Sequence, residues 1–80
     1  MKKLVVFKAH WCQPCKQLSK TLQGFDLGVP VETVDIDADP TATSEFDIRS
    51  VPTLLLMQEN QVLRRKTGNM SAEQLKAFVG

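Results

Sequence analysis

Residues 4–16 read LVVFKAHWCQPCK and contain the only two cysteines of the chain. The stretch opens with a continuous apolar run, Leu4–Phe7, which is typical of a strand buried on both faces. After a short loop come Cys12 and Cys15, separated by two residues. Pro14 fits the first turn of a helix, where the N–H that proline lacks is not needed. The sequence therefore predicts a strand, a loop and a helix that starts at about Cys12.

Two thiols at this spacing can close a small disulfide, and the helix start gives them different chemistry. Cys12 is expected at the N-terminal tip, where N–H groups point outward and favour the thiolate, which is the reactive form. We expect Cys12 to be exposed, to have the lower pKa and to attack first. We expect Cys15, one turn further on, to be more sheltered and to resolve the mixed disulfide. The pattern predicts dithiol–disulfide exchange.

A metal site is an alternative use of these cysteines. Zinc takes about four nitrogen or sulfur ligands, whereas Cys12, Cys15 and His10 supply at most three. Only a symmetric dimer could complete such a site, since the chain has no second cysteine pair. We therefore expect no metal and no bound cofactor, with the Cys12–Cys15 disulfide as the redox-active group.

The rest of the chain alternates between strand and helix patterns. A β-branched strand is predicted over residues 29–36, parallel to the first because a right-handed helical crossover connects them. Later patterns predict a helix from Asp39-Pro40 to about Phe46, strands over 53–57 and 61–67 joined at Glu59-Asn60, and a last helix behind a Ser71–Gln74 capping box. We expect one α/β domain over residues 1–80, a four-stranded mixed sheet flanked by three helices in the order β-α-β-α-β-β-α. The basic triplet 64–66 is assigned to protection of an edge strand.

Charge and hydropathy argue against several classes of protein. The net charge of +1 argues against a nucleic-acid binder that relies on counterion release. The apolar run near the N-terminus ends at Lys8, too early for a signal peptide, and no stretch approaches membrane-spanning length. We therefore expect a cytoplasmic protein that binds neither nucleic acid nor membranes. In that compartment a lone CxxC is more often catalytic or metal-binding than a structural staple.

Charge is also unevenly placed along the chain. Residues 1–24 carry five lysines and no acid, whereas residues 31–48 carry six acids and no base. The sequence therefore predicts that the cysteine end of the molecule is the more electropositive one.

These motifs, in this order, resemble the thioredoxin family. The stretch Trp11–Lys16 (WCQPCK) differs from the family's usual active site only at Gln13, which replaces a glycine. Val51-Pro52-Thr53 resembles the family's cis-proline segment. Further matches follow in register at Val34–Asp37, Pro40, Leu54–Leu56, Gly68 and Gln74–Lys76. The resemblance covers nearly the whole chain from Leu4 onward.

The resemblance implies a minimal thioredoxin fold that starts directly at a strand, without the family's usual leading strand and helix. It implies that Pro52 is cis and lies against the disulfide, although only about 5–6% of X–Pro bonds are cis. The backbone of Val51 would then pair with an extended substrate segment. Trp11 would offer an apolar contact surface beside Cys12, and Pro14 and Gly68 belong to the same substrate-positioning set.

Two departures from the family concern proton transfer. The family keeps a buried aspartate six residues before its first cysteine, and that position is Val6 here. The lysine that commonly partners this aspartate corresponds to Thr33, so both members of the pair are absent together and no buried charge is left unpaired. Proton transfer to and from Cys15 must then use water or another group. Candidates for tuning the thiols are Gln13, Lys8, His10 and Lys16.

By resemblance, the chain is a monomeric thiol–disulfide oxidoreductase that reduces protein disulfides and receives electrons from an NADPH-dependent thioredoxin reductase. The nearest alternative is a glutaredoxin-like protein that is reduced by glutathione, or that serves as electron donor to ribonucleotide reductase. Trp11 and the Gln13-Pro14 pair favour the thioredoxin interpretation, and the short N-terminus favours the alternative. A third possibility is a binding module that docks onto a partner enzyme, with cysteines that only shape its surface.

Overall fold

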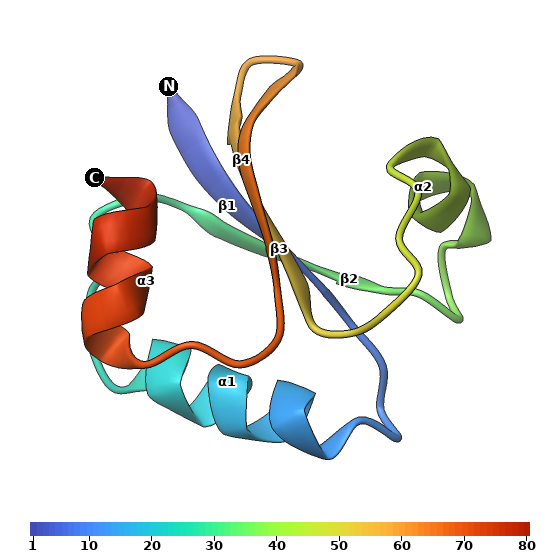
Figure 1. The fold of residues 1–80 in the computed structure, drawn as a ribbon, viewed down its shortest axis with the longest axis horizontal. Helices are drawn as coiled ribbons and strands as arrows, with labels where there is room; N and C mark the ends of the chain where they lie inside the picture. Colours follow the sequence, from blue (N-terminus) through green and yellow to red (C-terminus); the bar gives the residue numbers. More distant parts are fainter.

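The computed structural model describes residues 1–80 and has the predicted order of elements (Figure 1). The strands and helices, in chain order, are β1 (Lys2–Lys8), α1 (Gln13–Gln23), β2 (Val31–Asp35), α2 (Pro40–Glu45), β3 (Thr53–Gln58), β4 (Gln61–Thr67) and α3 (Ala72–Val79). The second strand is shorter than the predicted range 29–36. No helix is long and apolar enough to cross a membrane.

The four strands form one mixed sheet in the order β2-β1-β3-β4. β1 runs parallel to β2 and antiparallel to β3, and β4 is antiparallel to β3. The two central strands, β1 and β3, carry the continuous apolar runs, because both of their faces are covered. Since β1 and β2 are parallel, their carboxyl ends meet at the same edge of the sheet, and the cysteine loop follows the end of β1.

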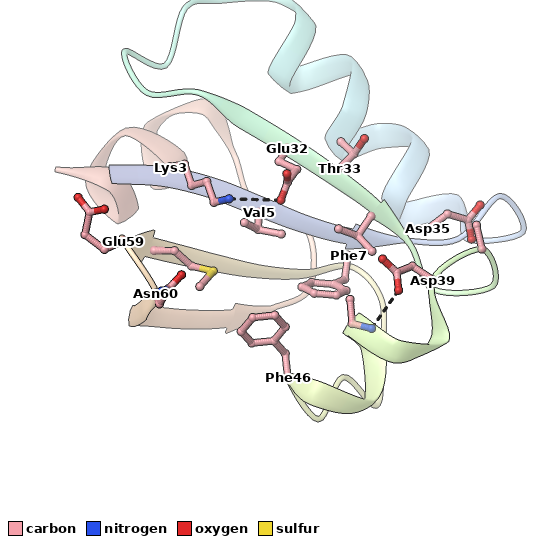
Figure 2. Close-up of a pocket in the computed structure, with 14 residues that line it drawn as sticks. Lys3, Val5, Phe7, Glu32, Thr33, Asp35, Asp39, Phe46, Glu59 and Asn60 are labelled. Atoms are coloured by element: carbon pink, nitrogen blue, oxygen red, sulfur yellow. Dashed lines mark hydrogen bonds and ion pairs between the residues drawn. The ribbon is translucent and has the colours of Figure 1, made fainter. Parts of the chain in front are cut away.

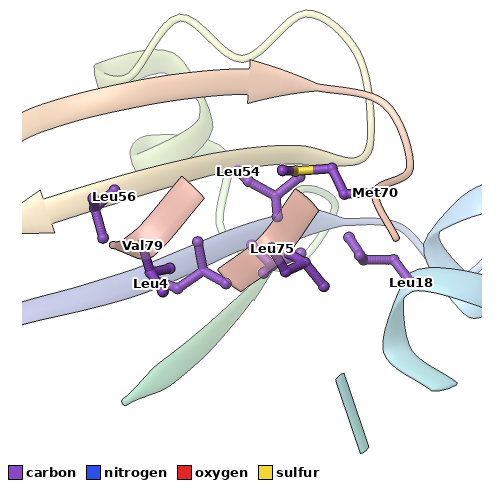
Figure 3. Packing of buried hydrophobic residues seen from close by; sticks show 8 residues of the cluster. Leu4, Leu18, Leu54, Leu56, Met70, Leu75 and Val79 are labelled. Carbon is purple, nitrogen blue, oxygen red and sulfur yellow. The ribbon is translucent and has the colours of Figure 1, made fainter. Parts of the chain in front are cut away.

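The two faces of the sheet are covered unequally. Alternate residues of a strand point to opposite faces, and Leu4 and Val6 of β1 pack with Leu18 of α1 and Leu75 of α3 (Figure 3). Phe7 points to the other face, where α2 alone covers the sheet. This arrangement is the minimal thioredoxin fold that the resemblance implies, and it places α1 against the sheet with its N-terminus at the carboxyl end of β1.

A cavity of about 460 Å³ lies on the α2 side of the sheet (Figure 2). Phe7 and Phe46 form part of its wall, with ring centroids 5.9 Å apart. At its rim, the Lys3 ammonium lies 3.6 Å from a carboxylate oxygen of Glu32. Neither cysteine lines this cavity, although Asp35, at the end of β2, does.

The basic strand β4 is an edge strand, as predicted, and its two arginines also hold the ends of two helices. Arg64 Nη1 donates to three carbonyl oxygens at the end of α3, at 2.7 to 3.3 Å. Arg65 donates to the carbonyl oxygens of Phe46 and Asp47, just after α2, at 2.6 and 2.7 Å. Cations are favourable at helix C-termini, where carbonyl groups lack partners. Arg64 and Arg65, adjacent in β4, thus form hydrogen bonds with the C-terminal ends of α3 and α2, which lie on opposite faces of the sheet.

Local capping signals in the sequence are confirmed at two helix starts. Asp39 Oδ1 accepts from the N–H of Ala42 at 3.0 Å, with Pro40 in the first turn of α2. Ser71 and Gln74 form the predicted capping box at the start of α3. The turn at residues 59–60 also joins β3 to β4 as predicted.

Candidate active site

The two cysteines lie at the start of α1, as the sequence predicts. Cys12 is the N-cap residue, and its Sγ accepts a hydrogen bond from the backbone N–H of Cys15 at 3.2 Å. Pro14 occupies the first turn of the helix, where its missing N–H costs nothing. An N–H aimed at Sγ of Cys12 stabilises negative charge on that sulfur, and no comparable contact is made to Cys15.

Cys12 and Cys15 are joined by a disulfide, with their Cα atoms 5.3 Å apart. The expectation that Cys12 is exposed is wrong for this oxidised form, since Cys12 is 5% exposed and Cys15 is 3% exposed. The physical reason is packing, because Ala9 lies in the same buried cluster and Ile36 and Val51 pack against it. The two sulfurs therefore differ in position along the helix and in hydrogen bonding rather than in burial.

The Val51–Pro52 peptide bond is cis and lies next to the disulfide, as the resemblance implies. Sγ of Cys12 lies 3.6 Å from the carbonyl oxygen of Val51. The N–H of Gly68 donates to the carbonyl oxygen of Pro52 at 2.9 Å, so the residue after β4 is joined to the cis-proline segment. The cis-proline segment, distant in the sequence, thus lies against Cys12.

Trp11 is 59% exposed beside the disulfide and is not part of the core. Its indole Nε1 donates to Oδ2 of Asp37 at 3.0 Å, and Nδ1 of His10 lies 4.0 Å from the same oxygen. Asp37 was not singled out from the sequence as a site residue. The available signal was topological, because Asp37 follows β2, whose carboxyl end lies beside that of β1 in the parallel pair.

A second, smaller cavity of about 190 Å³ lies against Cys15. Three of the predicted thiol-tuning residues, Lys8, His10 and Lys16, line it together with Asp35. The fourth, Gln13, is exposed at the tip of α1, and its side chain makes no hydrogen bond. The structure therefore brings three of these candidates together on the Cys15 side of the disulfide and leaves Gln13 apart from them.

The prediction of an electropositive cysteine end needs correction. Asp35 and Asp37 come from the acidic half of the sequence, yet both lie beside the cysteine loop. Parallel pairing of β1 with β2 sets Lys8 opposite Asp35 in the register, so acids and lysines are interleaved there. Acidic and basic residues that are far apart in the sequence are therefore neighbours at this end of the sheet.

No group of three or more His, Cys, Asp or Glu side chains is placed to hold a metal ion. A disulfide at the start of a helix, with a cis-proline loop against its first sulfur, defines the class of dithiol–disulfide exchange proteins.

Comparison with known proteins agrees with this class. The family model described as thioredoxin matches residues 1–80. The thioredoxin of Chlamydia muridarum is 36% identical over 79 residues, which cover 95% of this chain and 78% of that protein. A thioredoxin of Buchnera aphidicola is 39% identical over 80 residues, covering 95% of this chain and 74% of that protein. The chain belongs to the thioredoxin family, and like its relatives it is a thiol–disulfide oxidoreductase.

Solved structures show the same fold. Thioredoxin-2 of a malaria parasite has a TM-score of 0.89 at 26% identity, with 99% of this chain and 81% of that chain covered. Chloroplastic thioredoxin z has a TM-score of 0.83 at 28% identity, with 99% of this chain and 75% of that chain covered.

Proposed function

We propose that residues 1–80 act as one unit that reduces disulfides in other proteins through Cys12 and Cys15. In the reduced protein, the Cys12 thiolate attacks one sulfur of the target disulfide, and the other target sulfur leaves as a thiolate and takes up a proton. Cys15 then loses its proton and attacks Cys12, which releases the second target thiolate and closes the Cys12–Cys15 disulfide. Two electrons pass from the dithiol to the target. The hydrogen bond from the N–H of Cys15 to Sγ of Cys12 carries this assignment.

The surface around Cys12 is suited to an extended polypeptide. Val51 is half-buried, and its carbonyl oxygen lies 3.6 Å from Sγ of Cys12. A target strand that paired with the backbone of Val51 would bring its own sulfur to Cys12, in the manner of strand addition. Trp11, exposed on the other side, offers an apolar contact, and Pro14 and Gly68 complete the exposed rim. Pro52 would support this surface from below, since it is buried.

Cationic side chains near Cys15 would favour ionised sulfur. Lys8 is half-buried at the end of β1, and Lys16 lies on the same cavity. His10 lines this cavity too and adds a positive charge only when it is protonated. A positive charge close to a thiol stabilises the thiolate. We assign Lys8 the main tuning role, because it is less exposed than the other two and is therefore less screened by solvent.

We propose an NADPH-dependent thioredoxin reductase as the electron donor, with the chain acting as a monomer. Trp11 directly before Cys12 and Pro14 between the cysteines support this donor over glutathione. Continuous reduction of targets needs a compartment that keeps thiols reduced, which is the cytoplasm. Ribonucleotide reductase is one enzyme to which the chain would donate electrons under this proposal.

A coupled assay distinguishes the two donors. With insulin as the target, we expect the oxidised chain to support NADPH consumption through a thioredoxin reductase and to respond weakly to glutathione with glutathione reductase. The measurement is the steady-state rate with each donor system, with the Cys12→Ser variant as control. Reduction by glutathione alone, with no response to a thioredoxin reductase, would contradict the proposal and favour a glutaredoxin-like electron donor.

A further inference from the structure

The second step of the exchange requires Cys15 to lose a proton although it is only 3% exposed. Sheet residue Val6 is apolar and lies in the buried cluster beneath α1, so it cannot take that proton. The remaining route from Cys15 is the cavity of about 190 Å³ that it lines. This inference rests on the proposed function, because it concerns the step in which Cys15 resolves the mixed disulfide.

Most of the residues that line the cavity have polar side chains, and the cavity is large enough for several water molecules. Liquid water occupies about 30 Å³ per molecule, and a cavity with polar partners can hold water. Seven residues line it: Lys8 at the end of β1, Ala9 and His10 in the loop that follows, Cys15, Lys16 and Ser19 in α1, and Asp35 at the end of β2. Water in this space can connect Cys15 to a group that accepts a proton.

Asp35 is the only carboxylate among these residues, and carboxylates are ionised at neutral pH. It lies at the carboxyl end of β2, where Figure 2 shows that it also borders the cavity on the α2 side. Asp35 is half-buried and is opposite Lys8 in the parallel register. Its Oδ1 accepts the N–H of Asp37 at 2.9 Å, which fixes the side chain, and its Oδ2 has no protein partner. A carboxylate that is held at one oxygen, on a residue that lines the cavity, has the properties of a proton acceptor.

The other charged groups around the cavity are less suited to accept the proton. Lys8 and Lys16 carry ammonium groups, which donate hydrogen bonds and accept none, so they can only favour the thiolate. His10 lines the cavity, but its side chain is 80% exposed and its Nδ1 lies 4.0 Å from Oδ2 of Asp37. Asp37 itself is held by the indole of Trp11 and does not line the cavity. Ser19 offers a hydroxyl that can relay a proton but does not act as a base.

We propose that Asp35 accepts the Cys15 proton through water in this cavity when Cys15 attacks the mixed disulfide. The S–H bond of Cys15 breaks, water passes the proton to the Asp35 carboxylate, and the new Sγ–Sγ bond to Cys12 displaces the target thiolate. Asp35 then returns its proton to solvent. No electrons pass through Asp35, so the redox balance remains that of dithiol exchange. Asp35 accepts the proton through water and does not contact the reacting sulfurs, so we call it a positioning residue rather than a catalytic one.

The test separates the two chemical steps in one trace. A symmetric aromatic disulfide releases one coloured thiolate when Cys12 attacks and a second when Cys15 resolves the mixed disulfide. In Asp35→Asn we expect an unchanged first phase and a second phase slowed by about 100-fold, the lower end of what a positioned base contributes. The amide oxygen of asparagine can still accept the N–H of Asp37, so the turn is preserved.

The pH profile and added bases distinguish proton transfer from a structural effect. The deficit of Asp35→Asn should shrink as pH rises, since hydroxide replaces the missing carboxylate, and formate or imidazole should accelerate its second phase. Glu32→Gln removes a charge from the same strand outside the cavity and should leave both phases unchanged. An unchanged second phase in Asp35→Asn, or a slow one that added bases do not accelerate, would overturn the inference. A wild-type chain that releases no first thiolate would overturn the proposed function itself.

Discussion

The Cys12→Ser variant is expected to lose disulfide reduction by roughly 10³-fold or more, because a hydroxyl replaces the attacking sulfur. The Cys15→Ser variant should lose turnover as well, yet still attack the target and remain joined to it. The difference follows from position, since Cys12 is the N-cap whose sulfur accepts a helix N–H, whereas Cys15 lies one turn further into the helix. The measurement is insulin reduction together with mass spectrometry of non-reduced samples.

Each cysteine variant is the control for the other. A mixed disulfide should accumulate in Cys15→Ser, disappear on addition of reductant and be absent in Cys12→Ser. If Cys12→Ser formed the adduct and Cys15→Ser did not, the order of attack would be reversed. If Cys12→Ser kept its biological function, the chain would be a docking module rather than a catalyst.

The second large effect concerns stability. Phe7 is fully buried at 0% exposure in the central strand β1, and its ring packs against Phe46. Replacing a buried phenylalanine by alanine costs about 3–5 kcal/mol of unfolding free energy, from lost burial and from the cavity left behind. A chain of this length has a stability of about 4–12 kcal/mol. We therefore expect Phe7→Ala to lose a large part of its stability, or to be unfolded in part at room temperature.

Urea unfolding followed by circular dichroism measures this loss. Val62→Ala on the edge strand β4 is the matched control, because Val62 is 43% exposed and should cost little. Equal losses in Phe7→Ala and Val62→Ala would show that the α2 side of the sheet contributes no core, contrary to the packing described above.

The order of elements could be predicted from the sequence because local signals agree with the fold. Apolar runs mark the two central strands, and Asp39-Pro40 and the Ser71–Gln74 box mark helix starts. The short range of β2 was less predictable, since its residues are mostly exposed or half-buried and alternate weakly. The helix-capping role of Arg64 and Arg65 could not be predicted, because it depends on which helix ends reach the edge strand.

The sequence predicted the site residues that are close together in the chain, and it missed those that only the tertiary fold brings to the cysteines. Cys12, Cys15 and Pro14 lie within one helical turn, so their arrangement follows from the sequence. Asp35 and Asp37 approach the cysteines only because β1 and β2 are parallel neighbours. The burial of Cys12 was also missed, since the segments that cover it come from distant parts of the chain.

The central claim is that Cys12 is the more readily ionised and the more reactive of the two thiols at neutral pH. The most direct measurement is the rate of alkylation of each cysteine in the reduced protein as a function of pH. We expect Cys12 to react faster, with a midpoint well below the value of about 8.5 for an ordinary thiol. Equal, slow alkylation of both cysteines at neutral pH, with ordinary midpoints, would contradict the account.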